Sequence, residues 1–240
     1  MSSIRGDRRA AVLVVALLGL IIIGWALGCV VQDLAPGAFL DNVDGPVLRF
    51  FATHRQPWLT TTMQSVTRLG SSAVLVPMLV VVAAAWRWRR DSWSAGVLLA
   101  VSYVGAVLVT ETVKRLVSRP RPPTALAIGH FSGFAFPSGH ATQAVVAWGA
   151  LAFVTARAWP RAGRYHWLAV AAVVAMAVDL SRLYLGAHWL TDVVVGSLVG
   201  GAWLVVVVRT IGYALLPVPL HHQVMARDRD RCHRNAPGSA

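Results

Sequence analysis

Residues 190–212 read LTDVVVGSLVGGAWLVVVVRTIG, and this stretch decides the class of fold. It holds no charged residue between Asp192 and Arg209, and about 20 mostly apolar residues are enough to cross the hydrocarbon core of a bilayer as a helix. Five other runs are similarly apolar, at 10–31, 67–86, 93–112, 141–158 and 166–184. The sequence therefore predicts an all-α protein, a bundle of six transmembrane helices.

The composition of the 240-residue chain excludes other classes of protein. Hydrophobic residues make up 56% of it and charged residues only 13%, whereas soluble domains are about a quarter charged. This excludes a soluble globule and a disordered chain. The formal net charge of +12 comes from short arginine clusters between the apolar runs. A nucleic-acid-binding protein gathers its basic residues on one soluble face, so we expect no nucleic acid partner.

The arginines also predict the orientation of the chain. Arg5, Arg8 and Arg9 precede the first run, which is too long for the apolar part of a signal peptide, so we expect an uncleaved anchor. Basic residues near span ends are retained in the cytoplasm, and a cytoplasmic N-terminus leaves most of the 22 basic residues inside. We therefore expect a multi-pass protein of the cell membrane with both termini cytoplasmic. Residues 1–9 form the N-terminus, 10–216 the six-span domain and 217–240 a disordered tail.

Three polar stretches share the extracytoplasmic face under this topology. They read KRLVSRPRPP at 114–123, FPSGH at 136–140 and SRLYLGAHWLTD at 181–192. Polar residues buried at a membrane boundary are costly unless they find a partner or a ligand. The stretches therefore predict a functional site near the outer membrane surface.

The cations of these stretches favour a phosphate ligand. Lys114, the only lysine in the chain, supplies an ammonium, and Arg121 and Arg182 supply guanidinium groups that match phosphate oxygens. Ser138 and Gly139 lead into a helix, whose free N–H groups and positive dipole end favour an anion.

The histidines of the same stretches favour phosphoryl transfer. His188 and Asp192 are four residues apart and share a face if helical. The carboxylate can then accept the Nδ1 proton of His188 and leave Nε2 as a nucleophile. His140 can give and take a proton near neutral pH. The pattern predicts a phosphohistidine intermediate.

These stretches resemble the signature of the type 2 phosphatidic acid phosphatase (PAP2) superfamily, which is K-x6-R-P, then P-S-G-H, then S-R-x5-H-x3-D. The matching residues are Lys114, Arg121, Pro122, Pro137, Ser138, Gly139, His140, Ser181, Arg182, His188 and Asp192. The match covers about 114–192, and the six-span layout extends the resemblance over nearly the whole chain. It implies the helical core that this superfamily shares with the vanadate-binding haloperoxidases.

The resemblance also implies an activity and the role of each matching residue. It implies a metal-independent lipid phosphatase without a cofactor, whose partners are the bilayer and a membrane lipid substrate. His188 would attack phosphorus, and His140 would protonate the leaving oxygen and then activate water. The phosphoryl oxygens would be held by Lys114, Arg121, Ser138, Gly139 and Arg182. Candidate substrates are phosphatidic acid, phosphatidylglycerol phosphate and polyprenyl phosphates or diphosphates, and the oligomeric state is left open.

Two other classes of protein remain as alternatives. One is a non-catalytic membrane protein that binds or moves phospholipids, although such a protein has no need of His188, His140 and Asp192 together. The other is a vanadate-binding haloperoxidase, but those enzymes are larger and soluble.

Several residues outside the signature also have expected roles. We expect Arg115 and Arg119 to anchor in the headgroup layer, and Asp179 to pair with Arg182 three residues on. We expect residues 32–61 to lie along the headgroups and shape the entry of lipid. His221 and His222 have no third ligand nearby, so we expect no metal site there.

Overall fold

The regular structure of this protein is helical. The computed structural model describes residues 41–159 and 163–216, and every regular element in these ranges is a helix. Within these two ranges, four helices are long and apolar enough to cross a membrane. They are α4 (Ser72–Arg90), α5 (Ser94–Val117), α7 (Arg164–Tyr184) and α8 (Leu190–Val207), which continues through a π-helical turn (Val208–Gly212) into α9 (Tyr213–Leu215). The predicted all-α class is confirmed.

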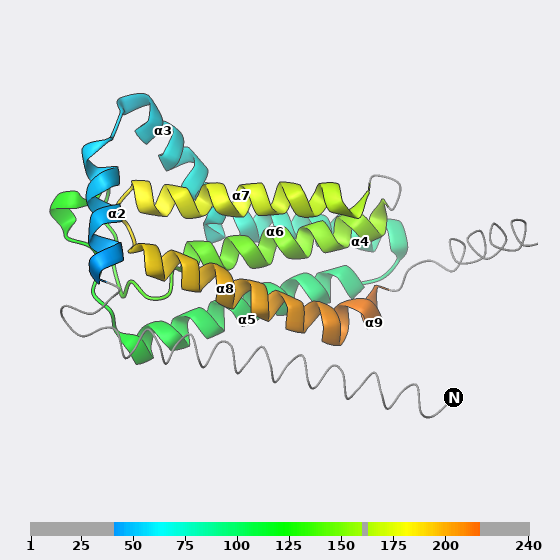
Figure 1. Cartoon of the computed structure of the whole chain (residues 1–240). Coiled ribbons are helices and arrows are strands. Elements are labelled where there is room, and N and C mark those ends of the chain that lie inside the picture. Colours follow the sequence, from blue (N-terminus) through cyan, green and yellow to red (C-terminus); the bar gives the residue numbers. More distant parts are fainter. Residues whose placement is uncertain (1–40, 160–162, 217–240) are drawn as a thin grey trace, which may run out of the picture.

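The predicted count of six spans is not reached within the described residues. The run at 141–158 forms α6 (Gly139–Ala158), which is not among the four apolar helices because its first turns carry His140, Thr142 and Gln143. It packs against α4, α5, α7 and α8 and is the central helix of the bundle (Figure 1). The run at 10–31, the N-terminus at 1–9 and the tail at 217–240 lie outside the described residues.

Two glycines let α8 approach α6 closely. A Cβ at Gly196 would lie 2.8 Å from the carbonyl oxygen of Ser138, and one at Gly200 would lie 2.8 Å from that of Thr142. The Thr142 hydroxyl donates to the Gly196 carbonyl at 2.9 Å. The Ser138 N–H donates to the Asp192 carbonyl at 2.9 Å. This packing places the start of α6 beside the start of α8.

Two short helices lie ahead of the bundle, α2 (Asp41–Thr53) and α3 (Pro57–Val66). Helix α2 crosses one end of the bundle and contacts α7 and α8 (Figure 1). A 3₁₀ turn, η1 (Thr67–Gly70), follows α3, so the helix predicted to begin at residue 67 begins at Ser72 instead. A second 3₁₀ turn, η2 (Thr124–Leu126), lies in the connection from α5 to α6.

The core and the outer surface are both apolar, as expected for a membrane protein. The main core cluster joins α4, α5, α6 and α8 through residues such as Leu75, Leu98 and Val154. Large apolar side chains are also exposed along the outside of the spans, including Val80 and Leu108. A soluble monomer rarely exposes so much contiguous apolar surface, so these outer faces suit contact with lipid.

Candidate active site

Four helix ends meet where the sequence predicts a site. Lys114 lies in the last turn of α5 and Arg182 in the last turn of α7, whereas Ser138 caps the start of α6 and Asp192 lies in the first turn of α8. Because consecutive helices run in opposite directions, these four termini share the end of the bundle that α2 crosses (Figure 1). We call it the site end, and the opposite end the far end.

The predicted phosphate-binding cations gather there, and two of the three have no carboxylate partner among the described residues. Lys114, Arg121 and Arg182 lie close enough to His140 to act on it electrostatically. Among the described residues, neither Arg121 nor Arg182 forms an ion pair with a carboxylate, and Nζ of Lys114 is 3.9 Å from its nearest one, Glu111. Within the described part of the chain, Nε of Arg182 is buried and has no hydrogen-bond partner. Such an arrangement favours an anionic ligand.

The start of α6 adds the dipole of a helix of 20 residues to these cations. The Ser138 side chain caps the helix and accepts the Ala141 N–H at 3.5 Å. A Cβ at Gly139 would lie 3.8 Å from Nζ of Lys114, so the bare α-carbon of this glycine faces the ammonium. Helix N-termini of this kind bind anions through free N–H groups.

The hydrogen bonds of His188 define its tautomer. Nη1 of Arg121 lies 3.2 Å from Nε2 of His188, and because a guanidinium only donates, Nε2 must be the acceptor. The ring proton therefore sits on Nδ1, which is 3.5 Å from Oδ2 of Asp192. This distance is longer than a good hydrogen bond, so His188 and Asp192 are in contact but do not form a good hydrogen bond.

His188 is neutral at neutral pH in this environment. Burial lowers its pKa from 6.5 to about 4, with further lowering by Arg182 and Arg121, while Asp192 acts in the opposite direction. The side chain is almost fully buried. A neutral imidazole with its lone pair on Nε2 is the form required of a nucleophile.

Two residues that the sequence did not assign to the site hold Asp192 in place. Nη1 of Arg119 donates to Oδ1 of Asp192 at 2.6 Å, and Nη2 donates to Oδ2 of Asp44 at 2.7 Å. Asp44 lies on α2 and also accepts from the N–H and the hydroxyl of Thr191, at 2.9 and 2.6 Å. Arg119, Asp44 and Asp192 are all buried. We call these three residues the buried bridge.

Two expectations about charged residues are wrong. Arg119 is not a headgroup anchor, because it is only 6% exposed and its guanidinium lies between two carboxylates. Asp179 does not pair with Arg182. Instead, Oδ2 of Asp179 accepts from the Ser197 hydroxyl at 2.6 Å, and Nη1 of Arg182 donates to the Thr67 hydroxyl at 2.9 Å. Asp179 and Arg182 thus have different hydrogen-bond partners, although they are three residues apart on one helix.

A tight turn between α7 and α8 positions His188. Gly186 has φ +67°, and a Cβ there would lie 2.4 Å from the Leu126 carbonyl oxygen, so only glycine fits. The Ile128 N–H donates to the Leu185 carbonyl at 2.8 Å. The side chain of Arg55 donates to the carbonyls of Leu126 and Tyr184. The connection from α5 to α6 is therefore fastened to the turn that carries His188.

The geometry suits the transfer of a phosphoryl group to histidine. A tetrahedral anion among the cations would lie beside the helix dipole and near a neutral imidazole, which are the components of electrostatic catalysis. In residues 41–159 and 163–216, no group of three or more His, Cys, Asp or Glu side chains is placed to hold a metal ion.

The family of this chain follows from its match to a known family model. The model of the PAP2 superfamily matches residues 95–215. The chain belongs to the PAP2 superfamily. The resemblance seen in the signature is confirmed, and the matched region contains every residue of the predicted site.

Relatives of this chain are membrane lipid phosphatases. Phosphatidylglycerophosphatase B of Bacillus subtilis (strain 168) is 34% identical over 163 residues, which are 67% of this chain and 79% of that protein. An undecaprenyl-diphosphatase of Sulfolobus acidocaldarius is 28% identical over 151 residues, 61% of this chain and 67% of that one. The crystal structure of a transmembrane PAP2 type phosphatidylglycerolphosphate phosphatase from Bacillus subtilis superposes with a TM-score of 0.73 at 27% identity, covering 80% of this chain and 93% of that one. This PAP2 member is a membrane phosphatase.

Proposed function

We propose that this PAP2 phosphatase removes phosphate from a membrane lipid through a phosphohistidine formed on His188. One observation carries the proposal. Nε2 of the buried, neutral His188 lies 3.2 Å from Nη1 of Arg121, which belongs to the same cluster of cations as Lys114 and Arg182. A phosphate that takes over the hydrogen bond from Arg121 frees this lone pair beside the phosphorus atom.

In the first step Nε2 of His188 attacks phosphorus and the P–O bond to the lipid breaks. His140, in its imidazolium form, gives its proton to the leaving oxygen. Partial burial and then the nearby cations oppose the charged form of the His140 ring. The negative charge of the bound phosphate offsets this opposition and so favours the protonated form. In the second step His140 takes a proton from water, the hydroxide attacks phosphorus, and the P–N bond breaks to release phosphate and free His188.

Arg119 and Asp44 act in this proposal as positioning residues. Attack by Nε2 builds positive charge on the imidazole, which a nearby carboxylate stabilises. The Asp192 carboxylate can move toward Nδ1 only as far as its bonds to Arg119 and to the Trp189 N–H allow. The buried bridge therefore fixes the carboxylate that orients the nucleophile.

The placement in the membrane is part of the proposal. Six spans with both termini cytoplasmic put the site at the extracytoplasmic face, and the distribution of arginines supports this. The far end holds the basic cluster Arg87, Arg89 and Arg90, as expected for a cytoplasmic end. A site at the membrane surface suits a substrate whose headgroup lies there while its tails stay in lipid.

The substrate proposed first is phosphatidylglycerol phosphate, because the named Bacillus relative covers two thirds of this chain at 34% identity. Phosphatidic acid and polyprenyl diphosphates stay as candidates, and the Sulfolobus relative supports the last of them. The same cluster of cations suits the phosphate of each.

The test is phosphate release by the purified full-length chain in detergent micelles that contain each lipid in turn, with EDTA present. We expect release from at least one lipid phosphate, and we expect His188→Ala to reduce it by at least about 10⁴-fold. Arg89→Gln at the far end serves as a matched control and should leave turnover unchanged. Undiminished release by His188→Ala would remove the nucleophile from the proposal, and activity only after a metal ion is added would remove metal independence.

A further inference from the structure

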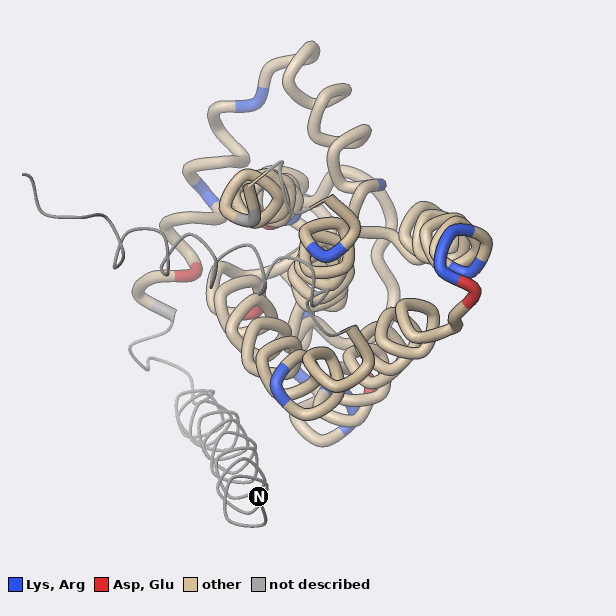
Figure 2. The backbone as a smooth tube through the Cα atoms, turned by 90° about the vertical axis from the view of Figure 1, so that its right-hand side faces the viewer, with Lys and Arg blue, Asp and Glu red and all other residues tan. Residues whose placement is uncertain are grey.

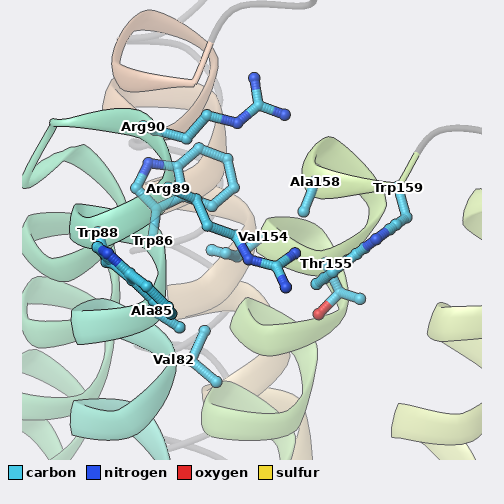
Figure 3. A pocket seen from close by; sticks show the side chains of 10 residues that line it. All are labelled: Val82, Ala85, Trp86, Trp88, Arg89, Arg90, Val154, Thr155, Ala158 and Trp159. Atoms are coloured by element: carbon cyan, nitrogen blue, oxygen red, sulfur yellow. The ribbon is translucent and has the colours of Figure 1, made fainter.

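At the far end of the bundle the structure contains a cavity of about 240 Å³ between α4 and α6. Its floor is apolar and is formed by side chains such as Val82, Ala85 and Val154, while Trp86 and Trp159 stand on its two sides (Figure 3). It is smaller than the ~300–1,000 Å³ of most small-molecule sites. It can therefore take part of an amphipathic molecule rather than a whole one.

Two arginines stand at the rim of this cavity, and both lack a carboxylate partner among the described residues. Arg89 reaches from α4 toward α6, and its Cζ lies 5.3 Å from the ring centre of Trp159 (Figure 3). Cζ of Arg90 lies 5.5 Å from the ring centre of Trp86. Arg87, two residues before Arg89, instead forms an ion pair with Asp91. Arg89 and Arg90 therefore keep guanidinium N–H groups available for an anion.

The position of the cavity defines what can reach it. It lies at the last turn of a membrane-spanning helix, the end of the bundle that faces the viewer in Figure 2. Tryptophan and arginine at this depth meet the headgroup layer of the bilayer, and basic pockets between spans bind anionic headgroups. The apolar floor continues toward the acyl-chain region.

We propose that this cavity binds an anionic glycerophospholipid of the leaflet at the far end. The headgroup phosphodiester accepts hydrogen bonds from Arg89 and Arg90, and the upper part of one acyl chain fills the space between α4 and α6. This is a binding site separate from the phosphate site at the other end, and a phosphodiester bound here is not hydrolysed.

The test is native mass spectrometry of the full chain in detergent, titrated with phosphatidylglycerol and with phosphatidylcholine of the same acyl chains. Millimolar inorganic phosphate is present to occupy the site at the other end. We expect saturable binding of phosphatidylglycerol, and weaker binding of phosphatidylcholine. Each arginine should contribute about fivefold to the affinity, so Arg89→Gln with Arg90→Gln should weaken it by roughly 25-fold.

Two matched variants separate a built site from a general attraction to positive charge. Arg87→Gln removes a charge from the same helix turn outside the cavity and should leave the affinity within twofold. Ala158→Trp fills the cavity, keeps both arginines and should weaken phosphatidylglycerol binding as much as their loss does. Phosphatase activity and elution volume check that each variant is folded.

Three results would overturn the proposal. An equal loss of affinity in Arg87→Gln and in the double arginine variant would mean that charge alone attracts the lipid. Unchanged affinity in a folded Ala158→Trp variant would mean that the cavity is not where the lipid binds. Unchanged affinity in a folded double arginine variant would mean that Arg89 and Arg90 do not hold the headgroup.

Discussion

Arg119 and Arg89 both lie at the end of an apolar helix, yet the structure uses them in opposite ways. Arg119, at the site end, is 6% exposed and bridges the carboxylates of Asp44 and Asp192. Arg89, at the far end, is exposed, has no carboxylate partner in the described part of the chain and lies over the ring of Trp159. The role of a basic residue beside a span thus depends on whether a distant segment brings a carboxylate to it.

The largest difference between the two ends is expected when each arginine is removed. Arg119→Ala leaves two buried carboxylates without their cation, which should lower the free energy of unfolding by about 3–5 kcal/mol. Arg89→Ala should change it by less than about 0.5 kcal/mol. Thermal unfolding of the two variants in one detergent measures the contrast.

A second substitution of Arg119 tests whether this residue also contributes to catalysis. Arg119→Lys keeps the charge but loses the planar guanidinium that donates to two carboxylates at once. If Arg119 positions Asp192, this variant should reduce kcat more than it raises KM. A folded Arg119→Lys variant with wild-type kcat would make the buried bridge purely structural.

Substitutions at the two ends should also differ in their effect on the pH dependence of protein stability, because the buried His188 lies at the site end. Its folded-state pKa of about 4 lies below the unfolded value of 6.5, so the unfolded chain binds the proton first as the pH falls. The stabilisation is therefore complete above pH 6.5 and is lost between pH 6.5 and about 4, at most about 3 kcal/mol.

The fall in Tm across this window should be steeper for the wild type than for His188→Asn, and Arg89→Gln should follow the wild type. Equal slopes in the wild type and in His188→Asn would contradict a buried, neutral imidazole.

A smaller effect is expected from Gly186→Ala. The new methyl group would meet the Leu126 carbonyl oxygen at 2.4 Å, with φ at +67°, so the turn that carries His188 must shift. We expect a loss of about 1–3 kcal/mol of stability together with reduced turnover. Gly163→Ala is the matched control because Gly163 has φ +71° and no atom of the described residues lies within 4 Å of the added methyl group, so it should cost stability without affecting turnover.

The smallest effect is expected at the far end. Arg89→Gln should leave kcat within about twofold in detergent, because Arg89 lies at the opposite end of the helices from His188 and contacts none of the site residues. Initial rates of phosphate release measure it. A loss of activity comparable to that of Arg119→Lys would show that the two ends are not separate in function.

The positions of the motif residues in the site could be predicted from the sequence. Their spacing can be read along the chain, and successive membrane helices run in opposite directions. Lys114, Ser138, Arg182 and Asp192 each lie at a helix terminus, and successive spans bring those termini to one end. Asp44 could not be found in this way, because it lies in a helix ahead of the spans, far along the chain from the arginine it binds. As long as Asp44 is not recognised as its partner, Arg119 resembles any other arginine beside a membrane span in the sequence.

Helix boundaries were less predictable than helix positions. Helix α4 was predicted to begin at Thr67, but Thr67–Gly70 forms a 3₁₀ turn and α4 begins only at Ser72. The central helix α6 starts at Gly139, two residues before its apolar run, because Ser138 caps it. The pairing of Asp179 was predicted wrongly because spacing along one helix does not show that Ser197 of α8 lies closer.

The most direct test of the central claim is to trap the phosphoryl group on the protein. Purified enzyme is mixed with a lipid carrying a ³²P-labelled phosphate, quenched with base within the first turnover, and digested. We expect label that is stable in base, labile in acid and located on the peptide that contains His188. Label on any other residue, or rapid turnover in which no labelled protein forms, would contradict it.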